Sequence, residues 1–168
     1  YQLGSLNGIR VYFNTLMGVA PRAVHWNLKS VGEYTGRQKF SYWLNGKNLY
    51  SVLNVKRENV NQIIEQIEKI RPEYIEGYTA SLVKLANFIN DSDLKIHHRP
   101  KAIIATSETL IESNRTLLEQ VFSSHVFNRY GSREFSGAVA QECRLHEGFH
   151  VNPLLTFTEI VDDNNEPV

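Results

Sequence analysis

Residues 128–150 concentrate side chains that could carry out chemistry. Tyr130, Gly131, Ser132 and Glu134 supply an aromatic ring, a glycine that permits close backbone approach, a hydroxyl group and a carboxylate. A ring can stack on a base, hydroxyl and backbone N–H groups can hold a phosphate, and a carboxylate can bind Mg²⁺. The combination predicts a site for a nucleoside triphosphate, although Gly131 could instead serve only to form a turn.

The single cysteine and two of the six histidines follow in the same stretch. Cys143, His146 and His150 have the spacing C-x2-H-x3-H, and thiolate and imidazole are ligands that Zn²⁺ prefers. A structural zinc site needs a fourth ligand, which this stretch does not supply. The alternative is that Cys143 is an inert buried hydrophobe and that the turn 145–148 exposes His146 to solvent. The spacing alone leaves both interpretations open.

A second polar cluster consists of Thr106, Ser107 and Glu108, directly after the apolar run 101–105. We predict that the run is a buried strand and that the cluster opens a helix over residues 110–121. Ser107 and Glu108 could therefore be an N-cap and a first-turn acid of that helix, or they could contact a ligand.

The chain between these clusters alternates between helical and extended patterns. Helices are predicted over residues 58–70, where Pro72 ends the helix, and around 82–89, with Thr79 or Ser81 as the N-cap. Extended segments are predicted at 73–78, 101–107, 125–130 and from 148 onward. This order predicts an α/β domain with a parallel sheet and flanking helices. Residues 1–55 indicate short strands and loops, with a possible helix near 15–32 that Pro21 interrupts.

The predicted sheet places the two polar clusters near each other. In open α/β sheets, ligands bind outside the carboxyl ends of the strands, where helix N-termini add partial positive charge. Each cluster follows a predicted strand, so neighbouring strands would bring both clusters to one crevice.

Composition excludes several classes of protein. The chain has 168 residues, 42% of them hydrophobic, which fits one globular domain over residues 1–168. Its 18 basic and 18 acidic side chains give no net charge, so we expect no nucleic-acid partner. One cysteine cannot form an internal disulfide, and no long apolar run or signal-like start is present. We therefore expect a cytoplasmic protein without a membrane partner.

Both ends of the sequence indicate a piece of a longer protein. The chain starts at Tyr1 without a methionine. At the other end, residues 156–161 read as a strand and 162–165 as a turn, after which we expect a return strand that the sequence does not contain.

The segment from Tyr130 to Glu134 resembles the Tyr-Gly-x-Thr/Ser-Glu motif of the adenylate-forming, or AMP-binding, enzymes. The wider set of segments "RPEYIEGYTASLVKLANFI", "AIIATSETL", "NRYGSREFSGAVAQEC" and "GFHVNP" with "TEIVDDNNEPV" resembles the branch of phenylacetate–CoA ligase and coenzyme F390 synthetase. That branch includes capsular polysaccharide proteins of the CapK type. The similarity covers about residues 55–168, and four ordered segments are more specific than one short motif.

The resemblance implies roles for the residues of the motif. Tyr130 would stack on adenine, with Gly131 beside it; Ser132 would touch the α-phosphate; and Glu134 would hold Mg²⁺ between phosphate oxygens. Ser132 and Glu134 are thus the residues implied in catalysis.

Other segments match less closely. Thr106, Ser107 and Glu108 correspond to the family segment that borders adenine and the adenylate, and Gly77 and Tyr78 correspond to a stretch near the carboxylate pocket. The implied reaction joins a carboxylate to ATP, giving an acyl-adenylate and pyrophosphate, and then transfers the acyl group to CoA or another acceptor.

The resemblance also implies what these 168 residues lack. No phosphate loop rich in Ser, Thr and Gly precedes the motifs, and the ribose-binding aspartate and the catalytic lysine of the small C-terminal domain would follow Val168. The chain is therefore expected to be inactive alone.

Some members of the branch carry a zinc ion bound by a matching cysteine and histidine and by a later Cys-x-Cys pair. This favours Cys143 and His150 as Zn²⁺ ligands and leaves His146 as a rival. The aromatic residues Trp26 and Trp43 are expected in packing, or as walls of an acyl or aryl pocket.

Two other functions remain open. One is a zinc hydrolase with Cys143, His146 and His150 as ligands and Glu142 or Glu147 as the base. The other is a nucleotide-binding or assembly domain without catalysis. An oligomer is possible in each case.

Overall fold

The computed structural model describes residues 2–30, 35–132, 137–152 and 157–168. The helices are α1 (Gln2–Leu16), α2 (Gly36–Leu44), α3 (Val60–Ile70), α4 (Thr79–Asp91) and α5 (Glu112–Phe122), with 3-10 turns at Val52–Asn54 and Arg57–Asn59. The strands are β1 (His25–Lys29), β2 (Lys47–Ser51), β3 (Tyr74–Tyr78), β4 (Ala102–Thr106), β5 (His125–Ser132), β6 (Gly137–Glu142) and β7 (Phe149–Val151).

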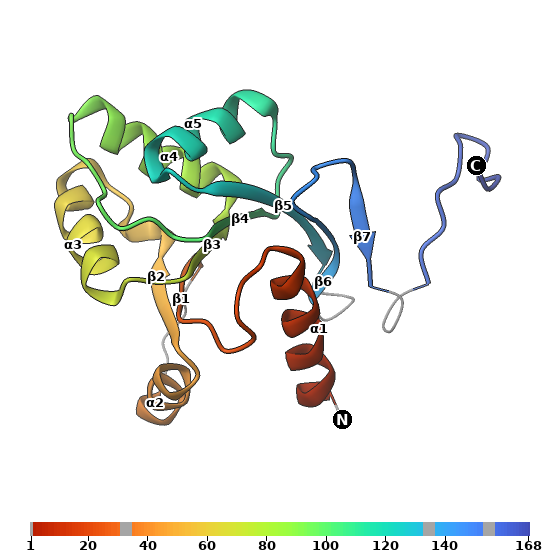
Figure 1. Ribbon diagram of the computed structural model, residues 1–168, viewed down its shortest axis with the longest axis horizontal. Helices are drawn as coiled ribbons and strands as arrows, with labels where there is room; N and C mark the ends of the chain where they lie inside the picture. Colours follow the sequence, from red (N-terminus) through yellow and green to blue (C-terminus); the bar gives the residue numbers. More distant parts are fainter. Residues whose placement is uncertain (1, 31–34, 133–136, 153–156) are drawn as a thin grey trace.

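These strands form one sheet in the order β2-β1-β3-β4-β5-β6-β7 (Figure 1). The first five strands in this order pair in parallel, whereas β6 and β7 are added antiparallel to β5. The structure confirms the predicted α/β fold with a parallel sheet and flanking helices. The antiparallel extension was not predicted from the sequence.

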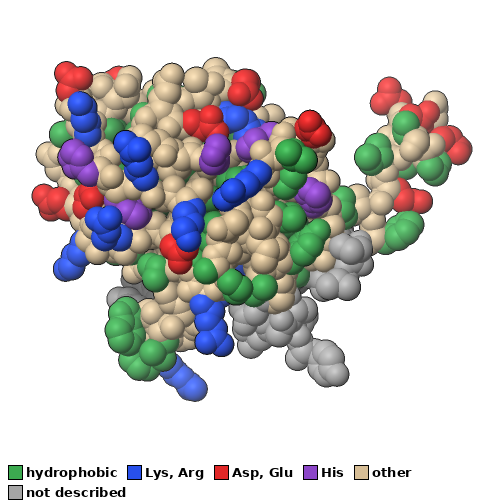
Figure 2. All heavy atoms as spheres, viewed as in Figure 1, with side chains coloured by type: hydrophobic (Ala, Val, Ile, Leu, Met, Phe, Trp, Pro, Cys, Tyr) green, Lys and Arg blue, Asp and Glu red, His purple; other side chains and the backbone are tan. Residues whose placement is uncertain are grey.

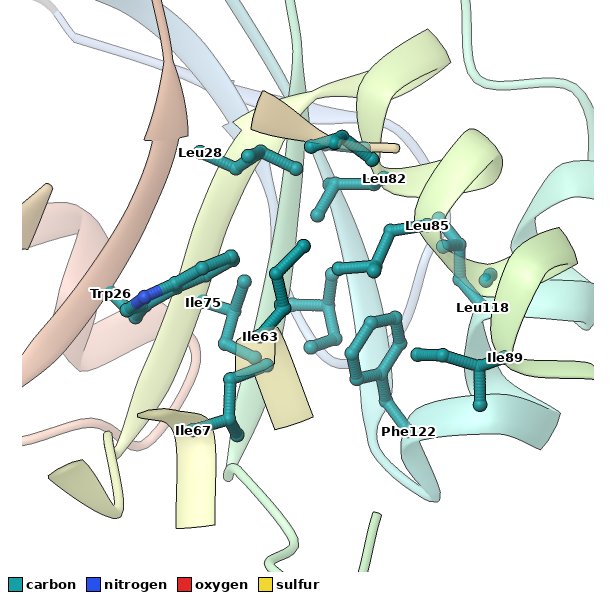
Figure 3. Packing of buried hydrophobic residues seen from close by; sticks show 14 of the residues in the cluster. Trp26, Leu28, Ile63, Ile67, Ile75, Leu82, Leu85, Ile89, Leu118 and Phe122 are labelled. Carbon is teal, nitrogen blue, oxygen red and sulfur yellow. The ribbon is translucent and has the colours of Figure 1, made fainter. Parts of the chain in front are cut away.

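One face of the sheet packs against α3, α4 and α5. Strand residues on this face, such as Trp26, Leu28 and Ile75, are almost completely buried against helix residues such as Ile63 and Leu85 (Figure 3). The apolar positions of α3 recur every three or four residues, so they form one stripe on the helix that faces the strands. Burial of each such side chain contributes about 1.5–3 kcal/mol, which makes this layer the main source of stability.

The opposite face of the sheet carries a smaller apolar cluster. Met17, which follows α1, packs with Tyr74, Ile104 and Phe127 of three strands, and α1 lies on this side of the sheet in Figure 1. Phe13 of α1 is also fully buried. Further along the same face, the buried side chains are polar or charged.

The sequence predicted the second half of the fold more accurately than the first. Helices α3, α4 and α5 and strands β3, β4 and β5 occur where they were expected. The predicted N-cap of α4 is wrong, because Thr79 and Ser81 lie inside the helix and Tyr78 occupies the cap position without a side-chain bond. The helix after the second polar cluster also begins later than expected, at Glu112.

In the first 55 residues, the possible helix near 15–32 is wrong, because strand β1 occupies residues 25–29. Helix α1 lies before it, in a segment that was expected to form short strands and loops. The signal for α1 was the spacing of Ile9, Phe13 and Met17, all of which are buried. Helix α2 starts at a capping box, in which Thr35 accepts from the backbone of Gln38 and the Gln38 side chain accepts from the backbone of Thr35.

The expected strand at 156–161 lies partly outside the described residues. Its described part makes one isolated bridge, between Val161 and Pro167, around a turn in which the Asn165 backbone donates to the Asp162 carbonyl. The chain therefore returns on itself within this segment, contrary to the expectation that no return follows the turn.

The distribution of charged side chains on the surface agrees with the net charge of zero. Side chains of both charges are mixed over the face seen in Figure 2, whereas hydrophobic side chains gather over α2, where Phe40, Trp43 and Leu44 are exposed. Trp26, in contrast, lies in the core. None of the helices in the described part of the chain is long and apolar enough to span a bilayer.

Gly77 is a packing position that tests this arrangement. A Cβ atom there would lie 3.0 Å from Leu28 Cβ and 3.0 Å from Leu82 Cγ, so β1 and α4 leave no room for a side chain. We expect Gly77→Ala to lower the free energy of unfolding by about 1–3 kcal/mol, measured by urea denaturation. Gly36→Ala is the control, because a Cβ atom there meets nothing within 4 Å. Equal stability of the two variants would contradict the close packing.

Candidate functional site

Two adjoining grooves lie at the carboxyl ends of the parallel strands. The first groove has a volume of about 500 Å³ and is bordered by the ends of β1, β3, β4 and β5, including Lys29, Tyr78, Thr106, Ser107, Arg129 and Ser132. The second groove has a volume of about 320 Å³ and is lined by Ser107, Glu108, Thr109, Asn128, Tyr130 and Phe149, among others. Ser107, Arg129 and Gly131 belong to both grooves. The two polar clusters of the sequence therefore meet in one crevice, as predicted.

The loop after β4 is held in place by contacts with α4. The backbone N–H of Ala80 donates to Glu108 Oε2 at 2.6 Å, and the Thr79 hydroxyl lies 3.2 Å from the Glu108 carbonyl and 3.3 Å from the Thr106 carbonyl. Glu108 therefore places a negative charge at the N-terminus of α4, where the helix dipole stabilises it. Neither Ser107 nor Glu108 caps α5, which has no side-chain cap.

Ser107 itself has a left-handed backbone, with a φ of 74°. Residues other than glycine rarely adopt this conformation, which costs about 1–2 kcal/mol, and such residues concentrate at functional sites. The contacts of Thr106 and Glu108 on either side of Ser107 hold the strained turn at the point where the two grooves meet.

The motif residues 130–132 form the last part of β5. The Tyr130 side chain is 61% exposed and lines the second groove, whereas Ser132 is half-buried and lines the first. At Gly131 the pairing with β6 shifts register, and a Cβ atom would lie 2.6 Å from the Gly137 carbonyl oxygen. Gly131 is thus required by the close approach of β6 and also lines both grooves. Glu134 lies outside the described residues.

The two residues that were assigned to the carboxylate pocket lie on different sides of β3. Gly77 is buried against Leu28 and Leu82 in the core, whereas Tyr78 is half-buried and lines the first groove. Their part in substrate binding stays a prediction.

A cluster of three charged side chains, which was not predicted from the sequence, lies at the first groove. Glu76 accepts from Lys29 Nζ at 2.5 Å, and Arg129 Nη1 lies 3.3 Å from Glu76 Oε2. Burial alone would raise the pKa of Glu76, but the charges of Lys29 and Arg129 outweigh burial and lower the pKa to about 2. The available signal was the single charged residue, Glu76, inside the short buried strand β3.

A second charged network ties α5 to the sheet. Arg115 Nη2 donates to both carboxylate oxygens of Glu142, at 2.9 and 3.1 Å, and the backbone N–H of Asn128 donates to the same carboxylate at 2.7 Å. Burial opposes the charge of Glu142, but these contacts prevail and lower its pKa. Glu142 is therefore a fixed, ionised anchor, which is unsuited to the role of a general base.

The three residues of the predicted zinc site differ in burial and in the contacts that they make. Cys143 is half-buried, and His150 is exposed on β7. The expectation that the turn exposes His146 is wrong, because its ring stacks on Phe127 at 5.3 Å and its Nδ1 lies 3.3 Å from Glu142 Oε2. Within the described residues, no three His, Cys, Asp or Glu side chains are grouped so that they could hold a metal ion. Zinc binding through Cys143 and His150 stays a prediction.

The fold matches that of solved acyl-activating enzymes. A 2-hydroxyisobutyryl-CoA ligase in complex with 2-HIB-AMP and CoA aligns with 96% of this chain at a TM-score of 0.74 and 12% identity. The Brucella canis acyl-CoA synthetase aligns with 98% of this chain at a TM-score of 0.62 and 14% identity. The anthranilate CoA ligase AuaEII in complex with anthranoyl-AMP aligns with 97% of this chain at a TM-score of 0.59 and 8% identity. The chain thus has the fold of the adenylate-forming enzymes, and the likeness extends into residues 1–55. This chain spans about a third of the length of each enzyme: 36% of the 2-hydroxyisobutyryl-CoA ligase, 31% of the acyl-CoA synthetase and 33% of AuaEII.

One curated relative lies in the branch that the sequence resembles. Protein CapK of Staphylococcus aureus is 30% identical to this chain over 102 residues, which are 58% of this chain and 23% of CapK. No family model matches the chain. The resemblance to adenylate-forming enzymes, including a CapK-type protein, is therefore confirmed.

The low pKa of Glu76 predicts a pH-dependent contribution to stability. Because the folded pKa lies below its ordinary value of 4.5, Glu76 stabilises the fold above that pH, and the contribution is lost as the pH falls toward about 2. We expect Glu76→Gln to cost at least about 2 kcal/mol in urea denaturation at neutral pH and less near pH 3. Glu73→Gln, which removes the more exposed pair with Lys101, is the control. A cost of Glu76→Gln that is the same at both pH values would contradict this assignment.

Proposed function

We propose that the whole protein that contains this chain is an ATP-dependent ligase that activates a carboxylate. A carboxylate oxygen attacks the α-phosphorus of ATP, the bond to pyrophosphate breaks, and an acyl-adenylate forms. A thiol such as that of CoA, or another acceptor, then attacks the acyl carbonyl carbon, and AMP leaves. The observation that carries the proposal is the pair of adjoining grooves at the strand ends, with residues 130–132 of the motif between them.

The second groove is the proposed nucleotide side. The exposed ring of Tyr130 offers a flat apolar surface on which adenine can stack. Ser107, which lines both grooves, and Ser132 of the motif, which lines the first, offer hydroxyl groups to the phosphates. Thr106 and Glu108 hold this wall in place through their contacts with α4.

The first groove is the proposed acid side. Tyr78 lines it, and Gly77 supports it by letting β1, β3 and α4 pack closely. With both substrates fixed in adjoining grooves, their reacting atoms need little further ordering, and this positioning is a large part of the rate enhancement in such a reaction.

The resemblance assigns Glu134 to a Mg²⁺ ion, and we retain that role in the proposal. The ion would neutralise negative charge on the phosphate groups. The likeness to CapK supports the branch that includes phenylacetate–CoA ligase, coenzyme F390 synthetase and CapK-type proteins. The acceptor is proposed to be CoA, because one of the similar ligases was solved with CoA and an acyl-adenylate.

Carboxylate-dependent exchange of pyrophosphate into ATP by the whole protein tests this function. We expect exchange with at least one acid of a broad aryl and acyl panel, and a fall of about 100-fold or more in Glu134→Gln, because the phosphate charge then lacks its counter-charge. Glu65→Gln, at an exposed position of α3, is the matched control. No exchange with any acid would refute the ligase, and full activity of Glu134→Gln would favour a non-catalytic nucleotide-binding role.

A second prediction concerns the stacking surface. We expect Tyr130→Ala to raise the KM for ATP by about tenfold, because base–aromatic stacking contributes about 1–3 kcal/mol per base, and to change the KM for the acid much less. Phe40→Ala, at an exposed aromatic residue of α2, is the control. The assignment fails if Tyr130→Ala changes the KM for the acid and leaves that for ATP unaltered.

A further inference from the structure

The proposed binding of ATP assigns no role to the charged cluster of Lys29, Glu76 and Arg129, of which Arg129 alone also lines the second groove. The three residues come from β1, β3 and β5, and all three line the first groove. Their side chains are 34%, 12% and 10% exposed, respectively, so the cluster runs from the rim of the groove into the protein. Burial of three charges is costly unless they are paired or needed, so the cluster calls for a functional explanation.

The cluster carries an excess of positive charge. Glu76 neutralises one of the two cations, which leaves a net charge of one. His25, in the same layer, adds no charge at neutral pH, because burial lowers its pKa to about 4. Among the described residues, no other carboxylate forms an ion pair with Lys29 or Arg129.

Arg129 also has unused hydrogen-bonding capacity. Its Nε donates to Gln141 Oε1 at 2.6 Å, and its Nη1 pairs with Glu76. Its Nη2 is buried and has no hydrogen-bond partner in the described part of the chain. A buried donor without an acceptor costs about 1–3 kcal/mol, and a ligand that supplies an acceptor recovers that energy.

The rest of the first groove is lined by small residues and one tyrosine. They are Ser30, Tyr78, Thr106, Ser107, Gly131, Ser132, Gly137 and Ala138. The tryptophans that were considered as walls of an aryl pocket lie elsewhere, since Trp26 is in the core and Trp43 is 69% exposed on α2. Pockets for aryl or alkyl groups are lined mainly by large hydrophobic and aromatic side chains, and among the described residues Tyr78 is the only such side chain that lines this groove.

We propose that the acid activated by this protein carries a second anionic group, a carboxylate in the simplest case, which Lys29 and Arg129 bind at the far end of the first groove. Lys29 meets the group at the rim, and Arg129 supplies charge and a free donor beneath. Glu76 holds both cations in place. This inference rests on the proposed ligase function and makes Lys29 and Arg129 specificity-determining residues.

Matched pairs of acids test the inference in the same exchange assay with the whole protein. The panel pairs each monocarboxylate with its ω-carboxylated counterpart: butanoate with succinate, pentanoate with glutarate, and phenylacetate with 4-carboxyphenylacetate. We expect kcat/KM to be about tenfold or more higher for the dicarboxylate in at least one pair, because a site built to bind a polar group discriminates strongly against analogues without it.

The variants Arg129→Met and Lys29→Met separate binding from folding. Each should remove the preference for the dicarboxylate through a higher KM for that acid, and Arg129→Lys should restore part of it. Lys29 does not line the second groove, so Lys29→Met should also leave the KM for ATP unchanged. Lys101→Met, which breaks the pair with Glu73 away from both grooves, should leave the preference intact. Lys29 lies at the rim, so its variant remains informative if Arg129→Met does not fold.

Three outcomes would overturn the inference. A preference for monocarboxylates throughout the panel would refute the second anionic group and leave the ligase function standing. An equal loss for both members of a pair in Arg129→Met would show that Arg129 binds the reacting carboxylate or only supports the fold. Exchange with no acid at all would refute the ligase function itself, and the inference with it.

Discussion

Parallel pairing of β1, β3, β4 and β5 is the constraint on which the rest of this structure depends. Parallel strands all end at the same edge of the sheet, so polar residues that follow separate strands are brought together there without any contact in the sequence. Thr106 of β4 and Arg129 of β5 are partners in the register, although 22 residues separate them in the chain. The two grooves are a consequence of this shared edge.

Two carboxylates, one exposed and one buried, hold that edge together in a consistent way. Glu108 accepts from the backbone at the start of α4, and Glu142 accepts from the backbone of β5 while it pairs with Arg115 of α5. Each carboxylate links segments that are distant in sequence and satisfies an N–H group that would otherwise be left without a partner. Charge-assisted hydrogen bonds thus fix the segments that border the crevice to the neighbouring helices.

Stability and the proposed specificity place opposing demands on the two faces of the sheet, because the first requires apolar packing and the second requires buried charges. The layer between α3–α5 and the sheet is apolar and tightly packed, to the point that Gly77 tolerates no side chain. The opposite face gives up part of its apolar packing to place Glu76 and Arg129 beneath the first groove. Such a division between a stabilising apolar face and a polar face is expected where a protein keeps energetically unfavourable groups at a functional site and offsets them by packing elsewhere.

The sequence by itself determined the α/β class, the elements from α3 to β5 and the motif residues at the end of β5, because these depend on local periodicity and short spacing. It misplaced the elements before β2, where the spacing of the buried residues Ile9, Phe13 and Met17 was the signal for α1 that was not used. Only the tertiary structure decided that Glu108 caps α4 and that Lys29, Glu76 and Arg129 form one cluster. The physical reason is that hydrogen bonds and ion pairs across strands follow the register of the sheet, which a local pattern does not encode.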